Sequence, residues 1–470
     1  MDSGNNSALS ASDRTRDGRV AVLMPYWRFW ETSVPWDLRA DREDLLAEAT
    51  SVIEDVCSVE VSAMLMEDES VPSVLEALRD VDAIVLLATM AAPSATSMAV
   101  LNAVPETPIM VWALSRSADL SPNFSHTEIT TAGSPVGAPM VTSALARAGR
   151  RFDVVATSIS APEAAKNAIR CAVTAGRLLR GPFLRVGDPI VGYTTVVPPT
   201  GSMSLLPSVA ASSSELAELS AHAPANEVAV TVSEIRNQFD VDPNVSELSL
   251  ERAARAEVGL RSMVQQTGAI AGTINCHEAA LRGNPAFGVA PCLALGRLTT
   301  MGIPFTCTGD ILTAFAMAAV RSLGYPTLYQ EIEAFDFEGN EVVLANSGEH
   351  DLGLCGDRPS LVPSNWYLHD SVVGPCARYS VPEGPGSLVA FVMTPEPRFV
   401  VAEGAFTGHS FNATGVPNAG FRFGGARVQD AWADWARAGV THHSVATNAH
   451  VGQELQRVAR LIGTHFIQVS

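Results

Sequence analysis

The N-terminal third of the chain contains short apolar runs that offer apolar side chains to both faces of a strand. They are rich in valine and isoleucine, are separated by segments of helical length, and read VAVLMP (20–25), DAIVLLA (82–88), PIMVWAL (108–114) and FDVVATS (152–158). Strands buried on both faces are typical of a parallel sheet covered by helices. The pattern predicts a doubly wound α/β domain over residues 19–183, preceded by a disordered tail at 1–18.

A chain of 470 residues is too long for one hydrophobic core, so further domains are expected. Helical patterns at 246–268 and 309–324 flank a short apolar strand at 269–275, which indicates a second α/β domain over 184–335. Within this domain, the stretch 198–226 is rich in proline, serine and alanine and is expected to be a long loop.

The last part of the chain has a different character, with apolar strands and frequent turn residues. A hairpin is expected around Gly339-Asn340 and a strand pair over 386–404, and one helical face of 452–463 is apolar. Residues 336–470 are therefore predicted to form a mainly β domain. The predicted fold class is α/β, with two doubly wound domains followed by this β-rich part.

The charged residues exclude several kinds of partner and mechanism. The formal net charge of −19 and the lack of a basic run argue against a nucleic-acid partner, because phosphate recognition needs clustered lysine and arginine. The single lysine, Lys166, lies in a predicted helix over 162–181, which makes it a poor candidate for Schiff-base chemistry. The chain has neither a GxxxxGK[ST] phosphate loop nor a GxGxxG dinucleotide motif.

The seven cysteines are an odd number, are widely scattered and include no CxxC pair. They fit buried reduced thiols better than a disulfide framework or a zinc site. The polar N-terminus lacks the apolar segment of a secretory signal, and no uninterrupted apolar run reaches about 18 residues. The expected location is therefore the cytoplasm, with no membrane partner.

Two clusters combine carboxylates with an unusual local sequence. In FTCTGDILTAF, Asp310 opens a helix, where it is either an N-cap for the first-turn amides or a site residue. In LYQEIEAFDF, strand alternation puts Tyr329, Glu331 and Glu333 on one face. Two carboxylates on one face repel each other, so they are expected to face solvent unless a cation or a proton offsets them.

A third cluster is the pair His442-His443 in GVTHHSVATNAHVG. Adjacent residues of an extended segment point to opposite sides, so at most one of the two is expected to enter a given site. Further polar side chains follow presumed strand ends, where α/β folds place their sites: His277, Glu278, Glu349, His350 and Asp351. Spacing alone does not rank these candidates.

Long stretches of the chain follow the motif order of a known enzyme superfamily. They read GVAPCLALGRLTTMGIPFTCTGD, LYQEIEAF, VVLANSG and WARAGVTHHSVATNAHVGQELQRVARLIG. In these stretches the chain resembles the L-fucose isomerase and L-arabinose isomerase superfamily. The N-terminal pieces RVAVLMPYW, DAIVLLATM and GAPMVTSALARAGRRFDVV are similar as well, so the likeness runs over most of 19–470.

The resemblance implies two Rossmann-like domains, a C-terminal β-rich domain, and homo-oligomers (trimers or hexamers) with active sites at subunit contacts. It also implies an aldose–ketose isomerase that acts through an enediol and binds a divalent metal, usually Mn²⁺. Hard oxygen donors with one imidazole suit this ion. The second family carboxylate falls on Glu331 and the ligand histidine on His443, while Asn346 matches the fucose-type NSG motif.

One position departs from the family pattern. The motif that CTGD resembles normally carries a glutamate that binds the metal and transfers a proton, whereas this chain has Thr308. A hydroxyl cannot act as the base at neutral pH, so Asp310, Glu333 or the acids of 349–351 would have to replace that carboxylate. Asp310 is then expected to bind the metal together with Glu331 and His443.

The expected activity is isomerisation of a sugar, with Glu331, Asp310 and Glu333 as catalytic residues. An uncharged sugar is preferred, because the chain has few lysines and no obvious arginine cluster. Two alternatives stay open because of Thr308: a lyase or hydrolase that acts on a sugar acid or sugar-like intermediate, and a catalytically inactive sugar-binding protein. The residues expected to contact the substrate are Thr308, Asn346, His442, His277, Glu278 and His350.

Overall fold

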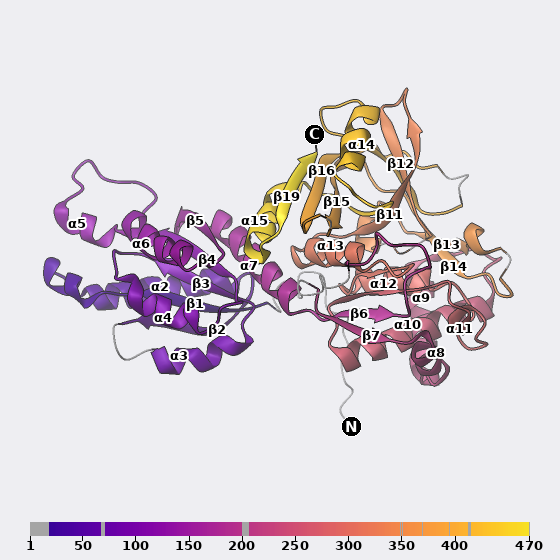
Figure 1. The fold of residues 1–470 in the computed structure, drawn as a ribbon, viewed down its shortest axis with the longest axis horizontal. Helices are drawn as coiled ribbons and strands as arrows, with labels where there is room; N and C mark the ends of the chain where they lie inside the picture. The colour runs from indigo at the N-terminus through magenta and orange to yellow at the C-terminus, as the bar shows by residue number, and fades with distance from the viewer. Residues whose placement is uncertain are drawn as a thin grey trace. The chain divides into compact units, whose positions relative to one another are not determined.

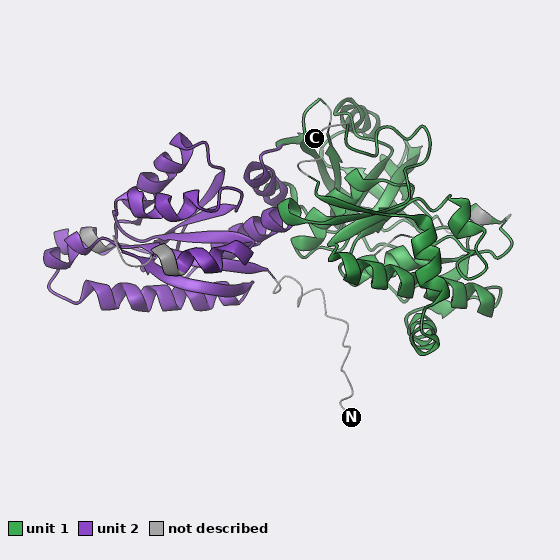
Figure 2. Ribbon diagram, turned by 60° about the horizontal axis from the view of Figure 1, so that its bottom comes forward, with its two compact units in different colours: residues 1–11, 178–453, 465–470 green, residues 12–177, 454–464 purple. Residues whose placement is uncertain are grey.

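The computed structural model of the protein describes residues 18–66, 71–199, 206–347, 349, 351–368, 370–393, 395–411 and 415–469. These residues form two compact units (Figure 2). Unit 1 comprises residues 178–453 and 465–469, and unit 2 comprises residues 18–177 and 454–464. The predicted tail at 1–18 lies, except for Gly18, outside the described residues.

Unit 2 is built on a five-stranded parallel sheet with the order β2-β1-β3-β4-β5. Its strands are β1 (Arg19–Pro25), β2 (Ser58–Leu65), β3 (Ala83–Ala88), β4 (Ile109–Ser115) and β5 (Phe152–Ser158). Every residue of the central strand β3 is buried, as expected for a strand covered on both faces. The strands predicted from apolar runs are therefore confirmed, and so is their parallel arrangement.

Strand β2 lies outside the pattern of apolar runs. It occupies the edge of the sheet, and its first six side chains alternate between exposed and partly buried, so polar residues interrupt the apolar ones in SVEVSAML. The helices and 3-10 turns of this unit are η1 (Arg28–Ser33), α2 (Leu38–Glu54), α3 (Val71–Ala77), η2 (Leu78–Asp80), α4 (Ser94–Asn102), α5 (His126–Thr131), α6 (Ser134–Arg147) and most of α7 (Glu163–Arg180).

Helix α15 (Gly452–Ile462) belongs to unit 2 from residue 454 onward, although it lies near the end of the chain. Arg457 and Arg460 form ion pairs with the buried carboxylate of Asp153 in β5. The stretch predicted as the β-rich domain thus contributes one helix to unit 2. The apolar face predicted for this helix is buried, with at most 1 % exposure for Leu455, Val458, Ala459 and Ile462.

Unit 1 contains a four-stranded parallel sheet with the order β10-β9-β6-β7, which confirms a second parallel α/β arrangement. The strands are β6 (Phe183–Val186), β7 (Ser208–Ala211), β9 (Ala271–Ile274) and β10 (Phe305–Thr306). The helices around them are α8 (Ser213–Ala221), α9 (Ala225–Gln238), α10 (Glu247–Thr267), α11 (Ala279–Arg282), α12 (Cys292–Thr300) and α13 (Ile311–Ser322).

The prediction of a long loop over 198–226 is wrong for its second half, which forms β7 and α8. The hydroxyl of Ser212 accepts the backbone N–H of Glu215, and the carboxylate of Glu215 accepts the backbone N–H of Ser212. This capping box starts a helix inside a serine-rich stretch that reads as a loop by composition alone. The helix then packs on α10, with Leu216 and Ala217 buried.

The C-terminal part of unit 1 is a mostly antiparallel sheet with the order β15-β18-β11-β12-β17-β16-β19. Strands β15 and β16 also pair with each other, which closes the sheet into a barrel, and β19 is added in parallel beside β16. The predicted hairpin and strand pair are confirmed as β11–β12 and β15–β16. The strands are β11 (Leu328–Asp336), β12 (Glu341–Ala345), β15 (Gly384–Val392), β16 (Arg398–Phe406), β17 (Asn418–Phe423), β18 (His443–Thr447) and β19 (His465–Val469).

A small sheet and short helices complete unit 1. The sheet has the order β14-β13-β8, with β13 antiparallel to β14 and parallel to β8. Among the described residues, no helix is both long and apolar enough to cross a membrane. The remaining elements are β8 (Asp240–Val241), η4 (Leu352–Leu354), β13 (Ser360–Pro363), η5 (Asn365–Tyr367), β14 (Pro375–Arg378) and α14 (Val428–Arg437).

Helix α13 links the parallel sheet of unit 1 to the barrel (Figure 1). It contacts β9 and β10 of the parallel sheet and β15 and β18 of the barrel, and most of its residues are buried. The start of this helix at Asp310 therefore lies where the two sheets of unit 1 meet. The candidate site is built at this junction.

Candidate metal centre

Glu331 and His443 are cross-strand partners in the barrel. Strands β11 and β18 pair in antiparallel register with Glu331 opposite His443, and the imidazole Nε2 lies 2.9 Å from Glu331 Oε1. The His443 side chain is 2 % exposed, whereas that of Glu331 is 32 % exposed. The pair therefore combines a buried imidazole with a carboxylate that solvent or a ligand can reach.

Asp310 holds the other ring nitrogen of His443. It is the N-cap of α13, and its Oδ1 accepts the backbone N–H of Thr313 at 2.9 Å. Its Oδ2 accepts hydrogen bonds from Thr313 Oγ1 and from His443 Nδ1, both at 2.8 Å. The N-cap interpretation is confirmed, and the same buried carboxylate also fixes the orientation of the imidazole.

The two carboxylates change the protonation of His443. Burial acts to lower the pKa of His443, but the hydrogen bonds to Asp310 and Glu331 outweigh it and raise the pKa to about 9. Burial acts to raise the pKa of Glu331, yet the hydrogen bond and charge of His443 leave that pKa below its usual value. A proton therefore lies between Nε2 and Glu331 at neutral pH, and a metal ion bound there would take its place.

His442 joins this pair, which corrects the prediction that only one histidine enters the site. The ring centroids of His442 and His443 are 3.8 Å apart at an interplanar angle of 39°. Strand β18 begins at His443, so His442 lies before the strand and does not follow its alternation. Ligand atoms of Glu331, His442 and His443 all lie within 4.8 Å of one another.

The predicted alternation along β11 holds for the residues next to His443. The ring of Tyr329 packs against that of His443 with centroids 4.7 Å apart, whereas Gln330 on the other face bonds to Ser444. Glu333 is exposed and its carboxyl faces that of Glu331. Burial and the negative charge of Glu331 raise the pKa of Glu333.

Thr308 occupies the position where the family motif has a glutamate. Its φ of 61° places it in the left-handed region, and its carbonyl accepts the backbone N–H of Ile190 at 3.2 Å. The hydroxyl donates to the carbonyl of Cys307 at 2.7 Å and is buried. The hydroxyl proton is therefore already bound to the backbone, and Thr308 offers no acid or base to the site.

The other predicted substrate contacts lie in different places. Asn346 is buried and follows Ala345, the cross-strand neighbour of Glu331, so it lies close to the centre. His277 is exposed and faces the thiol of Cys276, while Glu278 accepts the backbone N–H of Asp188 at 3.2 Å. Neither belongs to the Glu331 cluster. The remaining prediction, His350, lies outside the described residues.

The segment 187–199 next to the centre carries no motif that marks it as functional. The ring of Tyr193 packs against that of His442 with centroids 5.1 Å apart, and Thr195 Oγ1 lies 3.2 Å from Thr441 Oγ1. Pro189 lies so close to Gly309 that a Cβ added to Gly309 would be 2.4 Å from the Cα of Pro189. The only local sign in the sequence is the cluster of turn residues in GDPIVGY.

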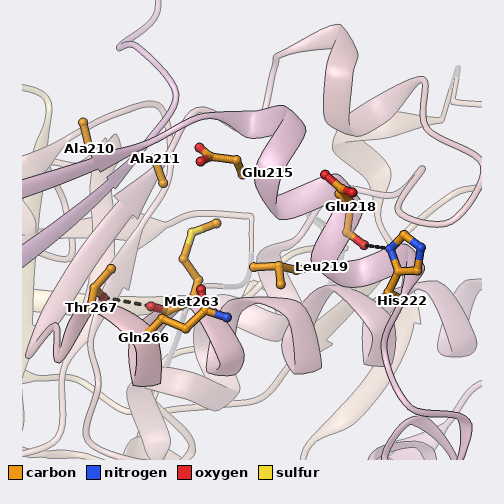
Figure 3. A pocket seen from close by; sticks show the side chains of 9 residues that line it. All are labelled: Ala210, Ala211, Glu215, Glu218, Leu219, His222, Met263, Gln266 and Thr267. Atoms are coloured by element: carbon orange, nitrogen blue, oxygen red, sulfur yellow. Dashed lines mark hydrogen bonds between the residues drawn. The ribbon is translucent and has the colours of Figure 1, made fainter.

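A separate cavity of about 420 Å³ lies among β7, α8 and α10 in unit 1 (Figure 3). It contains none of the residues predicted from the sequence. Its acidic side chains include Glu215, which is committed to the capping box of α8, and Glu218, whose carbonyl accepts a bond from His222 Nδ1 at 2.9 Å. The convergent titratable groups of the Glu331 cluster therefore make that cluster the better candidate for chemistry.

No family model matches the chain, and no curated protein matches it significantly.

Proposed function

We propose that this protein is a divalent-metal-dependent aldose–ketose isomerase of the L-fucose and L-arabinose type. The pairing of Glu331 with His443 is the observation that supports this most directly, because these are the residues on which the family's ligands fall. Asp310 supplies the carboxylate that a metal-binding histidine usually has on its second nitrogen.

The donor set fits a divalent ion. Glu331, His442 and His443 offer one carboxylate oxygen and two imidazole nitrogens within 4.8 Å of one another. Such a set suits Mn²⁺ and other first-row metals, and three protein ligands leave coordination positions open for a substrate. When bound, the ion would hold the two reacting oxygens of the sugar and polarise its carbonyl.

The protein's own groups then divide the remaining tasks. Asp310 keeps the His443 ring in place, and its position behind the imidazole gives it this orienting role rather than direct contact with the ion. Glu333 is exposed beside Glu331, and burial and the charge of Glu331 raise its pKa, which makes it a stronger base; we assign to it the transfer of a proton between C1 and C2 of the sugar. We assign the binding of a sugar hydroxyl to Asn346, which follows the cross-strand neighbour of Glu331.

The remaining expectations from the resemblance belong to the same proposal. They are the arrangement of two Rossmann-like domains and a β-rich domain, a homo-oligomer (trimer or hexamer) with sites at subunit contacts, and a cytoplasmic location. The two parallel sheets and the antiparallel barrel support the first of these. An uncharged sugar is the proposed substrate, because the carboxylates of the centre would repel an acidic one.

Incubation with sugars in D₂O tests the activity. With Mn²⁺ added, we expect at least one aldose among a panel of pentoses and 6-deoxyhexoses to give its ketose and to take up deuterium next to the carbonyl. Mass spectrometry and NMR measure both results, and Glu333→Gln should lower the rate by about 100-fold while Mn²⁺ still binds. If no sugar of the panel gives a ketose and none takes up deuterium, the isomerase proposal is excluded.

The orienting role of Asp310 gives a separate expected result. Asp310→Asn keeps a good N-cap for α13 but presents an amide N–H to His443 Nδ1, so the affinity for Mn²⁺ should fall by about 10- to 100-fold. Isothermal titration calorimetry measures the change. Thr313→Val is the matched control, because it removes one bond to Asp310 and leaves the bond to His443 in place.

Thr308 favours a second candidate, a lyase or hydrolase that acts on a sugar acid or sugar-like intermediate on the same scaffold, or an inactive sugar-binding protein. The observation behind these alternatives is that the family's usual carboxylate is replaced by Thr308, whose hydroxyl donates to the carbonyl of Cys307. Thr308→Glu separates the candidates: isomerase activity that appears only in this variant would mean that the natural protein does not isomerise sugars. Purified protein without a stoichiometric metal would favour the inactive binding protein.

A further inference from the structure

Several buried cysteines surround one buried carboxyl group at an edge of the parallel sheet of unit 1. Cys276 follows β9 and Cys307 follows β10, and these parallel neighbours end at the same edge of the sheet. The loops after them are tied together, because the N–H of Gly309 donates to the carbonyl of Ile274 at 3.2 Å. The group is completed by Cys292, Cys376 and Glu349.

Cys276 has the surroundings of a thiolate. Its sulfur faces the thiol of Cys307, the side chain of His277 and the backbone N–H of Thr308. The contact with Cys307 is the strongest of these, and together they outweigh burial and hold the pKa of Cys276 well below its usual value. The thiol is 2 % exposed, but His277 beside it is exposed and opens toward solvent.

Glu349 has no conventional reason to be buried where it is. Its side chain is 0 % exposed, and neither carboxyl oxygen has a hydrogen-bond partner of normal geometry among the described residues. The groups that face it are the thiols of Cys307 and Cys292. A buried carboxyl group without a partner costs stability, so its presence behind Cys307 calls for a chemical explanation.

We propose that Cys276 and Cys307 are a redox-active dithiol that a hydroperoxide converts into a disulfide, with Cys276 as the attacking sulfur, Cys307 as the resolving sulfur and Glu349 as the base for Cys307. The proposal is independent of sugar isomerisation. Each role follows from position: Cys276 lies beside exposed His277, whereas Cys307 lies between Cys276 and Glu349. A protein in a reducing compartment would form such a bond only transiently.

The chemistry balances with the hydroperoxide as the only oxidant. The Cys276 thiolate attacks one peroxide oxygen, the O–O bond breaks, and the leaving oxygen takes a proton from His277 to give water or an alcohol. Glu349 then removes the proton of Cys307, whose sulfur attacks the Cys276 sulfenic acid. The S–O bond breaks as the S–S bond forms, and the hydroxide that leaves takes the proton from Glu349. Two thiols lose two electrons, and the peroxide gains them.

A structural metal site explains this cluster less well. Among the described residues, the only group of three potential ligands within 4.8 Å of one another is Glu331, His442 and His443. The thiols and the carboxyl instead lie in a row, in which Cys307 faces Cys276 on one side and Glu349 on the other. Such a row suits proton transfer from Cys307 to Glu349 and formation of an S–S bond between Cys276 and Cys307 better than it suits the enclosure of one ion.

Peptide mapping of the full-length protein tests the proposal. The reduced protein is freed of reductant, titrated with hydrogen peroxide, alkylated after denaturation and digested with trypsin. Cleavage at the arginines places Cys276, Cys292 and Cys307 in the separate peptides 262–282, 283–297 and 298–321. We expect peptide 262–282 to become linked to 298–321 at peroxide concentrations that leave Cys292 as a free thiol. Oxidation of Cys292 at the same rate, or no linkage, would overturn the proposal.

Variants separate the two steps. Cys307→Ser should stop at a Cys276 sulfenic acid that a 1,3-dione traps, whereas Cys292→Ser, a buried neighbour of Glu349, should close the disulfide like the natural protein. Glu349→Gln should slow disulfide closure by about tenfold or more and leave the rate of sulfenic acid formation unchanged. A Glu349→Gln variant that slows both steps equally would show a packing role only and would contradict the assignment of Glu349 as the base.

Discussion

Replacing Glu331 with glutamine should abolish stoichiometric Mn²⁺ binding, with a loss of affinity of more than about 100-fold. The amide keeps the size of the side chain but removes the only carboxylate of the group Glu331, His442 and His443. It also removes the negative charge that the cation would meet, and a neutral amide oxygen is a poor ligand for a divalent ion in competition with water. Calorimetry measures the affinity, and Mn²⁺ EPR measures the free ion directly.

The matched control is Glu338→Gln, which changes an exposed carboxylate in the turn that follows the same strand. It alters the net charge of the protein equally but faces no histidine of the centre, so the affinity for Mn²⁺ should stay the same. The expected order of affinities is natural protein, then Asp310→Asn, then Glu331→Gln. A Glu331→Gln variant that binds Mn²⁺ as tightly as the natural protein would mean that the ion binds at a different site.

The apolar runs predicted the strands of unit 2 most directly where every residue is buried, as in β3. Runs such as 82–88 are apolar because both faces of β3 are covered, and this leaves a signal in every residue. The edge strand β2 and the helix α8 lack that signal. Polar residues interrupt the apolar ones in β2, and α8 depends on a capping box in a serine-rich segment, so neither element stands out by composition.

The candidate site was predictable in part. Motifs identified Glu331 and His443, and the register of β11 and β18 brings the two side chains together. Strand alternation failed for His442, because the strand starts one residue later. The bond between Asp310 and His443 joins segments more than a hundred residues apart, and no local pattern in the sequence encodes such a contact.

Glu349 illustrates the same limit more strongly. It appeared in the sequence only as one of three polar residues after a strand, with nothing to distinguish a buried acid from an exposed one. Its surroundings come from separate parts of the chain, namely the segments that carry Cys276, Cys292 and Cys307. The effect of Glu349 on the pH dependence of stability can therefore be predicted from the packed structure but not from the sequence.

Glu349→Gln should raise the free energy of unfolding, relative to that of the natural protein, by more at alkaline pH than at acidic pH. Burial raises the pKa of Glu349 from 4.5 to about 7. Between these two values the folded protein keeps the proton while the unfolded chain has lost it, so the free energy of unfolding of the natural protein falls as the pH rises. The full loss above pH 7 is roughly 3 kcal/mol.

The variant carries a neutral amide at this position at every pH, and any cost of burying that amide does not depend on pH. Between about pH 5.5 and pH 8.5, its free energy of unfolding should therefore gain roughly 2 kcal/mol on that of the natural protein. Urea unfolding at a series of pH values measures the difference, and Glu338→Gln should give a difference that stays constant. If the difference for Glu349→Gln is also constant with pH, the carboxyl group of Glu349 ionises equally well in the folded and unfolded protein, because water or a cation reaches it.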